Sequence, residues 1–325
     1  MLLWVIGGGG GLLGSHLHLA LRQRFPQAQL WQPTPPHFSW HDTARLAAEL
    51  EDAVAAFAAT VRERASPWSV FWCAGKGVVT STAAALEPEW LAWTRLLELL
   101  GSALAVGDRA RPGTIFLASS AGALHSGDRA DFFTEDSPPT ASSAYGVHKL
   151  RMEDVLRRWI AAFPSASCLI GRISTLYGPG QDLQKAQGII SHLSRCLIHR
   201  RAVDIYVSLD TRRDYLFVGD CVYEIAASMG RLLKEPPGST VTKIFASEEP
   251  TNLARIIGVF FQMAKHRPLI ICRQPRGTRP VSLKFRSQVW RDLEGSCKTD
   301  LPTGIHLVHE HQLGLFRKGL LPAPA

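Results

Sequence analysis

The chain has 325 residues, 46% of them hydrophobic, and can therefore bury a core larger than one typical domain needs. No run of about eighteen apolar residues occurs, which argues against a membrane-spanning helix. The net charge of +8 is spread along the chain, and this favours an anionic small ligand over nucleic acid.

Strand-like apolar runs and helix-like segments alternate through the first half of the chain, which predicts an α/β fold with a parallel sheet. We expect strands at 2–6, 29–31, 69–75, 114–117 and 167–172, and helices at 12–25, 43–64, 86–106 and 144–162. A further, third strand is expected around Phe38–Trp40. The second half predicts helices at 183–200, 252–265, 287–293 and 304–315, and strands at 204–206, 243–246 and 269–272.

The first strand runs into five consecutive glycines and then a helix. Gly8, Gly11 and Gly14 have the spacing G-x-x-G-x-x-G. This is the context of a dinucleotide site, because glycines let the backbone approach a pyrophosphate at a helix N-terminus. The predicted cofactor-binding residues are Gly8, Gly11, Leu12, Leu13 and Gly14, with Ala74 and Gly75 after a later strand. A plain glycine-rich turn is the alternative interpretation.

Tyr145 and Lys149 are four residues apart in a predicted helix and therefore share one face. A lysine ammonium beside a phenol favours the phenolate and is expected to lower the tyrosine pKa towards the range of acid/base catalysis. Taken alone, this spacing is common in exposed helices.

Several segments together resemble the extended branch of the short-chain dehydrogenase/reductase superfamily, the NAD(P)-dependent sugar epimerase/dehydratase family. Besides the glycine segment and the Tyr-Lys pair, they are the serine loop 117–122, the stretch Arg172–Gly180 and the stretch Arg212–Val222. The resemblance implies a Rossmann-type doubly wound sheet with a smaller C-terminal α/β lobe. It places the Rossmann domain at 1–175 plus about 205–235, and the substrate lobe at about 176–204 and 236–325.

The resemblance also implies the roles of individual residues. Ser120, with Ser119 as the alternative, is expected to hydrogen-bond the reacting oxygen. Tyr145 is expected to move the proton, and Lys149 to tune Tyr145 and hold the nicotinamide ribose. Ser120, Tyr145 and Lys149 are the predicted catalytic residues, and Tyr145 and Lys149 also bind the cofactor. The predicted substrate-binding residues are Ser119, Ser120, Thr175, which replaces the family asparagine, and Arg213, which matches the family arginine for a diphosphate.

The cofactor is expected to be NAD or NADP. The family usually carries an acid after the second strand, where it binds the adenosine ribose, but this chain has Gln32 and Pro33 there. Without that acid a 2′-phosphate meets no repulsion, so either cofactor fits. The family's dehydratases carry an Asp-Glu pair where this chain has Ala121 and Gly122, so we do not expect a 4,6-dehydratase.

We therefore predict an enzyme that epimerises or reduces a nucleotide-activated sugar. A non-catalytic dinucleotide-binding sensor or scaffold of the same fold is the alternative. The resemblance implies a homodimer formed through the helices at 86–106 and 144–162, with no nucleic-acid or membrane partner. Six cysteines without C-x-x-C spacing suggest reduced thiols in the cytoplasm. His306, His309 and His311 are interpreted as helix-surface residues, and no metal site is expected.

Overall fold

The structure is a computed structural model of the chain, and it describes residues 1–104, 111–125, 131–184, 188–264, 269–273, 282–293 and 298–324. Cys297, Val106 and Lys265, the last two at the predicted ends of helices, lie outside the described residues. The five described cysteines are free thiols. Across the described ranges, none of the helices is both long and apolar enough to cross a bilayer.

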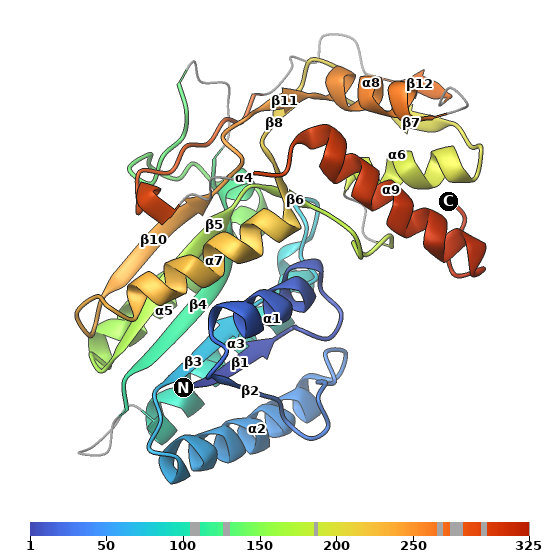
Figure 1. The fold of residues 1–325 in the computed structure, drawn as a ribbon. Coiled ribbons are helices and arrows are strands. Elements are labelled where there is room, and N and C mark those ends of the chain that lie inside the picture. The colour runs from blue at the N-terminus through green and yellow to red at the C-terminus, as the bar shows by residue number, and fades with distance from the viewer. Residues whose placement is uncertain are drawn as a thin grey trace.

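Six parallel strands form the central sheet in the order β10-β5-β4-β3-β1-β2 (Figure 1). They are β1 (Leu2–Ile6), β2 (Gln29–Trp31), β3 (Trp68–Trp72), β4 (Gly113–Ser120), β5 (Ala166–Ile173) and β10 (Thr240–Phe245). The chain leaves β1 towards β2 and then returns to β3 on the other side of β1. This reversal is the switch point at which doubly wound sheets bind ligands, beyond the carboxyl ends of the strands. The predicted fold class is confirmed.

Helices cover both faces of this sheet (Figure 1). One face is packed against α2 (Thr43–Glu63), α3 (Ala83–Leu104) and α5 (Ala144–Ala162), and the other against α1 (Leu12–Arg24) and α7 (Val218–Leu232). Each apolar helix stripe meets a sheet face with large side chains. Trp72 and Trp93, for example, have ring centroids 5.2 Å apart. A single turn of helix, α4 (Ala121–Leu124), follows β4 directly.

The third strand predicted around Phe38–Trp40 is wrong. After β2 the chain runs through an irregular segment to α2, and it contributes no further strand to the sheet there. Proline cannot donate to a strand ladder, and three of the residues between 32 and 36 are prolines. Phe38 and Trp40 instead pack their rings against the core. The ring centroids of Phe38 and Trp4 are 6.4 Å apart, and those of Trp40 and Trp72 are 6.1 Å apart.

The second lobe has its own apolar core around three helices: α6 (Ile189–Ile198), α8 (Leu253–Met263) and α9 (Leu301–Arg317). Three two-stranded pairs accompany these helices. They are β6 (Thr175–Tyr177) with β9 (Tyr215–Phe217), β7 (Val203–Ile205) with β12 (Ile270–Cys272), and β8 (Arg212–Arg213) with β11 (Thr251–Asn252). In Figure 1 this lobe lies beyond the carboxyl ends of the sheet strands, where β5 leads into β6.

Two predictions about the second half need correction. Residues from 236 onwards were assigned to the lobe, but β10 completes the central sheet by pairing with β5. A helix was expected at 287–293, where the structure has only the 3₁₀ turn η1 (Arg291–Leu293). The start of that segment is held extended because the Glu135 carboxylate accepts hydrogen bonds from Ser287 and from the Gln288 backbone.

Candidate active site

The glycine turn after β1 is held by close backbone packing. Gly7 has φ +88°, in the left-handed region that favours glycine, and a Cβ there would lie 2.7 Å from the Ala74 backbone nitrogen. A Cβ on Gly14 would lie 2.5 Å from the Gly7 carbonyl oxygen. Gly14 therefore allows α1 to approach the turn, and Gly7 allows the turn to approach the end of β3. The sequence pattern identified Gly14 but not Gly7.

The N-terminus of α1 suits a pyrophosphate. Its N-cap, Gly11, makes no side-chain capping hydrogen bond, and no acid stands in the first turn. The first backbone N–H groups thus lack a capping side chain. A Cβ on Gly9 or Gly10 would meet nothing within 4 Å, so the space above the turn is open. Leu13 is buried in the core, so only its backbone can serve a ligand. These residues fit the phosphates of a dinucleotide at a helix N-terminus.

Tyr145 and Lys149 lie on one face of α5, as their spacing predicts. The Ser143 hydroxyl caps this helix by accepting from the Gly146 N–H at 3.1 Å. The Lys149 Nζ is 5.7 Å from the centroid of the Tyr145 ring. Lys149 is 4% exposed. The ammonium is thus fixed beside the phenol in a site with little water.

The loop after β3 connects the glycine turn to this pair. Ala74 packs against Gly7, as described above. A Cβ on Gly77 would lie 3.0 Å from the Tyr145 ring. Gly75 has φ +150°, and a Cβ there would lie 2.8 Å from the Glu89 carboxylate. Ala74, Gly75 and Gly77 therefore bridge the glycine turn and the phenol, the juxtaposition that a nicotinamide site requires.

The two serines at the end of β4 have different partners. The Ser119 hydroxyl is buried and donates to Glu153 Oε1 at 2.6 Å. Ser120 is half-buried, and its Oγ accepts from the Ala123 N–H at 3.3 Å as the N-cap of α4. Ser119 is therefore committed within the protein, which argues against its predicted substrate contact. Ser120 is the serine left for a ligand, and the packing of Gly146 against the Ala123 carbonyl places α4 against the start of α5.

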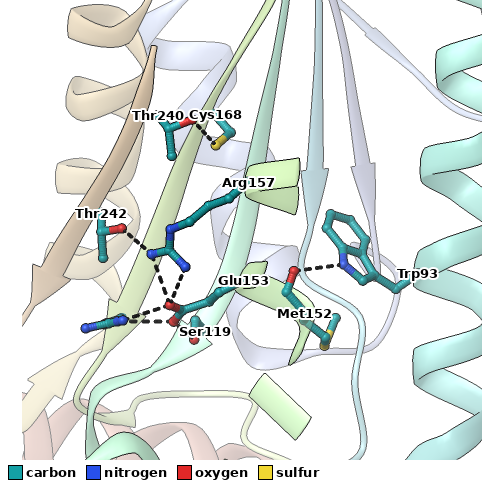
Figure 2. Close-up of polar contacts among 9 residues, drawn as sticks. Trp93, Ser119, Met152, Glu153, Arg157, Cys168, Thr240 and Thr242 are labelled. Atoms are coloured by element: carbon teal, nitrogen blue, oxygen red, sulfur yellow. Dashed lines mark hydrogen bonds and ion pairs between the residues drawn. The ribbon is translucent and has the colours of Figure 1, made fainter. Parts of the chain in front are cut away.

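Glu153 organises the buried charges beneath the site (Figure 2). It is 0% exposed. Arg172 donates to both of its oxygens, at 3.1 and 2.8 Å, and Arg157 donates at 3.3 Å while also reaching Thr242 at 2.8 Å. Figure 2 shows how Arg157 connects the α5 carboxylate to the strand that carries Thr242. This network joins α5, β4, β5 and β10, and so fixes the helix that bears Tyr145 and Lys149.

The predicted lowering of the Tyr145 pKa is wrong in its net direction. Burial of the phenol raises the pKa above its ordinary value, Lys149 opposes this, and Glu89 adds to it. Burial dominates because the phenolate loses its hydration. In this structure Tyr145 is therefore a proton donor at neutral pH.

Glu89 is a residue of the site that none of the sequence motifs includes. It lies on α3 and accepts a hydrogen bond from Lys149 Nζ at 2.8 Å. A signal was present: Glu89 falls three residues after Leu86 and four before Trp93, on the apolar stripe of the helix. An acid on a buried stripe calls for a buried cation as its partner.

The end of the site near β2, where the family binds the adenosine ribose, differs from the end near Tyr145. In the loop from 32 to 42 the first acid is Asp42, and its side chain caps α2 by accepting from the Arg45 N–H. No described carboxylate of that loop is thus left for a ribose. Two exposed basic side chains meet there instead, with Lys76 Nζ 3.2 Å from His41 Nε2.

The predicted substrate residues lie where the sheet meets the lobe. Thr175 is half-buried at the start of β6, and Arg213 is half-buried in β8. Burial lowers the pKa of Arg213. The adjacent Asp214 is fully buried and accepts from Ser174 at 2.7 Å and from the Ser247 N–H at 2.8 Å. A cavity of about 500 Å³ opens nearby, between Tyr215, α7 and the start of α9, and none of the predicted catalytic residues lines it.

Comparison with known proteins gives two curated relatives. The chain is 29% identical over 126 residues to the dTDP-L-rhamnose 4-epimerase of Burkholderia thailandensis, covering 38% of this chain and 34% of that protein. It is 31% identical over 115 residues to the dTDP-4-dehydro-6-deoxyglucose reductase of Escherichia coli, covering 35% of this chain and 36% of that protein. The matches thus span about a third of each relative.

Solved structures match over the full length. The UDP-glucose-4-epimerase of Stenotrophomonas maltophila, solved with bound NAD and formylated UDP-arabinopyranose, superposes with a TM-score of 0.78 at 16% identity. The superposition covers 98% of this chain and 99% of that one, and it supports the fold. The model of the NAD dependent epimerase/dehydratase family matches residues 4–240, from β1 through α5 to the start of β10. By this match, and by the glycine turn and the Tyr-Lys pair within it, the chain belongs to that family.

Proposed function

We propose that this protein uses a nicotinamide dinucleotide to epimerise or reduce a nucleotide-activated sugar. The observation that carries the proposal is the contact chain from Gly7 through Ala74 and Gly77 to the ring of Tyr145, with Lys149 beside that ring. The curated relatives are a dTDP-sugar epimerase and a dTDP-sugar reductase. The structure of the S. maltophila epimerase contains NAD and a UDP-sugar.

When bound, the nicotinamide accepts or donates a hydride at a sugar carbon. The side chains of the protein handle the accompanying proton. During oxidation the sugar hydroxyl gives its proton to the Tyr145 phenolate as the C–O bond becomes a carbonyl. During reduction the Tyr145 phenol returns a proton to that oxygen. Ser120 donates a hydrogen bond to the same oxygen, and Lys149 stabilises the phenolate and holds the ribose.

The groups that would hold the substrate are cationic and polar. Arg213 has a planar guanidinium whose two parallel N–H groups match a diphosphate, and Thr175 offers a hydroxyl at the start of β6. Ser120 is followed in the chain by Ala121, which is buried, and by Gly122. Neither can act as the acid or base of a dehydration, which supports epimerisation or reduction over 4,6-dehydration.

Assembly and location are part of the proposal. We infer a homodimer through α3 and α5, supported by Leu91 and Val147, which are 51% and 48% exposed on these helices. The free thiols of the described cysteines suit the reducing cytoplasm.

The test is turnover by the purified chain. UDP- and dTDP-sugars, keto sugars included, are incubated with oxidised or with reduced NAD or NADP, and the products are identified by NMR. The protein after gel filtration is analysed for retained cofactor. A retained dinucleotide with an epimerised product supports an epimerase. Stoichiometric oxidation of a supplied reduced cofactor supports a reductase. Failure to bind either dinucleotide and to convert any of these sugars contradicts the proposal.

A further inference from the structure

Glu89 makes direct contact with the catalytic lysine. Its Oε1 accepts from Lys149 Nζ at 2.8 Å, and its side chain is 9% exposed. His148, the residue before Lys149, places Nε2 at 3.6 Å from the same oxygen. The backbone of Gly75 also approaches the Glu89 carboxylate. A Cβ on Gly75 would lie 2.8 and 2.9 Å from its two oxygens. The carboxylate is therefore enclosed by α5 on one side and the loop after β3 on the other.

We propose that Glu89 is a positioning residue that holds the Lys149 ammonium in place and keeps Tyr145 in its proton-donating form. The inference deepens the proposed function and rests on it for the role of Tyr145. The coupling between the three side chains, however, can be measured without any substrate.

The charges of the pair support this role. Burial acts to raise the pKa of Glu89, but Lys149 and His148 outweigh it and bring that pKa to about 2. Burial acts to lower the pKa of Lys149, but Glu89, together with Tyr145 and Glu153, outweighs it, so the ammonium stays charged. At neutral pH a negative charge therefore faces a positive charge beside the phenol. Glu89 opposes the effect of Lys149 on the Tyr145 pKa, and burial, the largest cause, raises that pKa further.

The other titratable groups around Lys149 do not replace Glu89. Glu153 also acts on Lys149, but it is held by Arg172 and Arg157, as described above. Cys73, at the end of β3, has its pKa raised by burial to about 12, so it remains a neutral thiol. His148 is an imidazole and supplies no negative charge. Among the described residues, Glu89 is thus the carboxylate placed to offset the ammonium next to Tyr145.

The direct test is a titration of Tyr145 in the whole protein, without added substrate. Tyrosinate absorbance is followed against pH in the wild type and in Glu89→Gln, each with and without Tyr145→Phe, so that the difference isolates one of the five tyrosines. We expect the Tyr145 midpoint in Glu89→Gln to fall by about one pH unit or more, the usual effect of one nearby charge. Removing the carboxylate takes away its repulsion of the phenolate, and the phenolate that forms itself keeps the Lys149 ammonium charged.

Glu87→Gln is the matched control. Glu87 is on the same helix, and its side chain is 50% exposed opposite Arg151 at 3.8 Å. The midpoint should not move in this variant. Glu89→Asp withdraws the carboxylate by one methylene and should give an intermediate fall, which also covers the case in which Glu89→Gln does not fold.

The outcomes separate the two proposals. A Tyr145 midpoint that is the same in the wild type and in the folded Glu89 variants overturns the role of Glu89, whatever the enzyme does. A shifted midpoint in a protein that converts no nucleotide sugar overturns the proposed function and leaves the coupling intact. In an active enzyme the pH at which sugar oxidation reaches half its maximum should move down with the midpoint, because Tyr145 must be deprotonated to act as base.

Discussion

The two ends of the proposed cofactor site are built in different ways. At the nicotinamide end the functional groups are buried and held by charged partners, as Lys149 is by Glu89. At the adenosine end the chain offers an irregular loop and two exposed basic side chains, Lys76 and His41. The difference follows from what each end must do. Proton and hydride transfer require groups fixed to a fraction of an ångström, whereas holding an adenosine needs only enough binding energy.

Tyr145→Phe tests the nicotinamide end most strongly. The change removes one hydroxyl, so the fold and cofactor affinity should be retained while turnover falls about 10²- to 10⁴-fold, the usual contribution of an acid/base group. Steady-state kcat and cofactor titration measure the two effects. Tyr206→Phe is the control, because Tyr206 is 63% exposed and outside the site. Equal turnover in the wild type and Tyr145→Phe would contradict the role of Tyr145, and no turnover in either protein would favour the non-catalytic sensor.

Glu153→Gln tests the scaffold beneath that end. The variant leaves the Arg172 guanidinium, whose side chain is 6% exposed, without its carboxylate. We expect the free energy of unfolding to fall by about 3–5 kcal/mol, the cost of breaking a buried pair by removing one partner. Denaturant unfolding measures the change. Asp154→Asn is the control, since that exposed residue pairs with Arg158 at 3.7 Å and should matter little. Similar losses in both variants would mean that the buried network does not support the site.

Gly14→Ala acts between the two ends, at the pyrophosphate. Its Cβ would lie 2.5 Å from the Gly7 carbonyl oxygen, so α1 must move away from the turn. We expect a loss of about 1–3 kcal/mol in stability, typical of overpacking, together with weaker dinucleotide binding. Melting and calorimetric titration measure both. Gly10→Ala, whose Cβ meets nothing within 4 Å, should leave stability unchanged, and a comparable loss there would contradict the packing argument.

The contrast between the ends also explains what the sequence could predict. The bounds of β2 and α5 match their predictions because short apolar runs and a capped helix are local features. The third strand failed because Phe38 and Trp40 have the alternation of a strand, while the prolines before them exclude a ladder. Their rings are instead half-buried and pack against Trp4 and Trp72. Packing against distant residues, which no local pattern records, decided this segment.

The site shows the same limit at the level of single side chains. Ser119 and Ser120 are neighbours on a strand and therefore point to opposite faces. Only the folded structure shows that the Ser119 hydroxyl donates to Glu153. The sign of the Tyr145 pKa shift was predicted from Lys149 alone, but it depends on burial and on Glu89, which comes from another helix. Motifs identified the reacting groups, and long-range partners set their states.

The smallest expected effect is at the adenosine end and concerns cofactor choice. If a 2′-phosphate is bound there, Lys76 is a cation placed to meet it, because its Nζ lies 3.2 Å from His41 Nε2 in the loop after β2. Lys76→Ala should then weaken NADP binding by about two- to fivefold and leave NAD binding unchanged, since an exposed ion pair contributes only about 0.2–1 kcal/mol. The NADP effect should shrink as salt is added, because exposed charges are screened. His41→Ala should act in the same direction, and His37→Ala, in the same exposed loop, should not. Equal losses for both dinucleotides in Lys76→Ala would show that this end does not read the 2′ position, and the cofactor would then be selected elsewhere in the site.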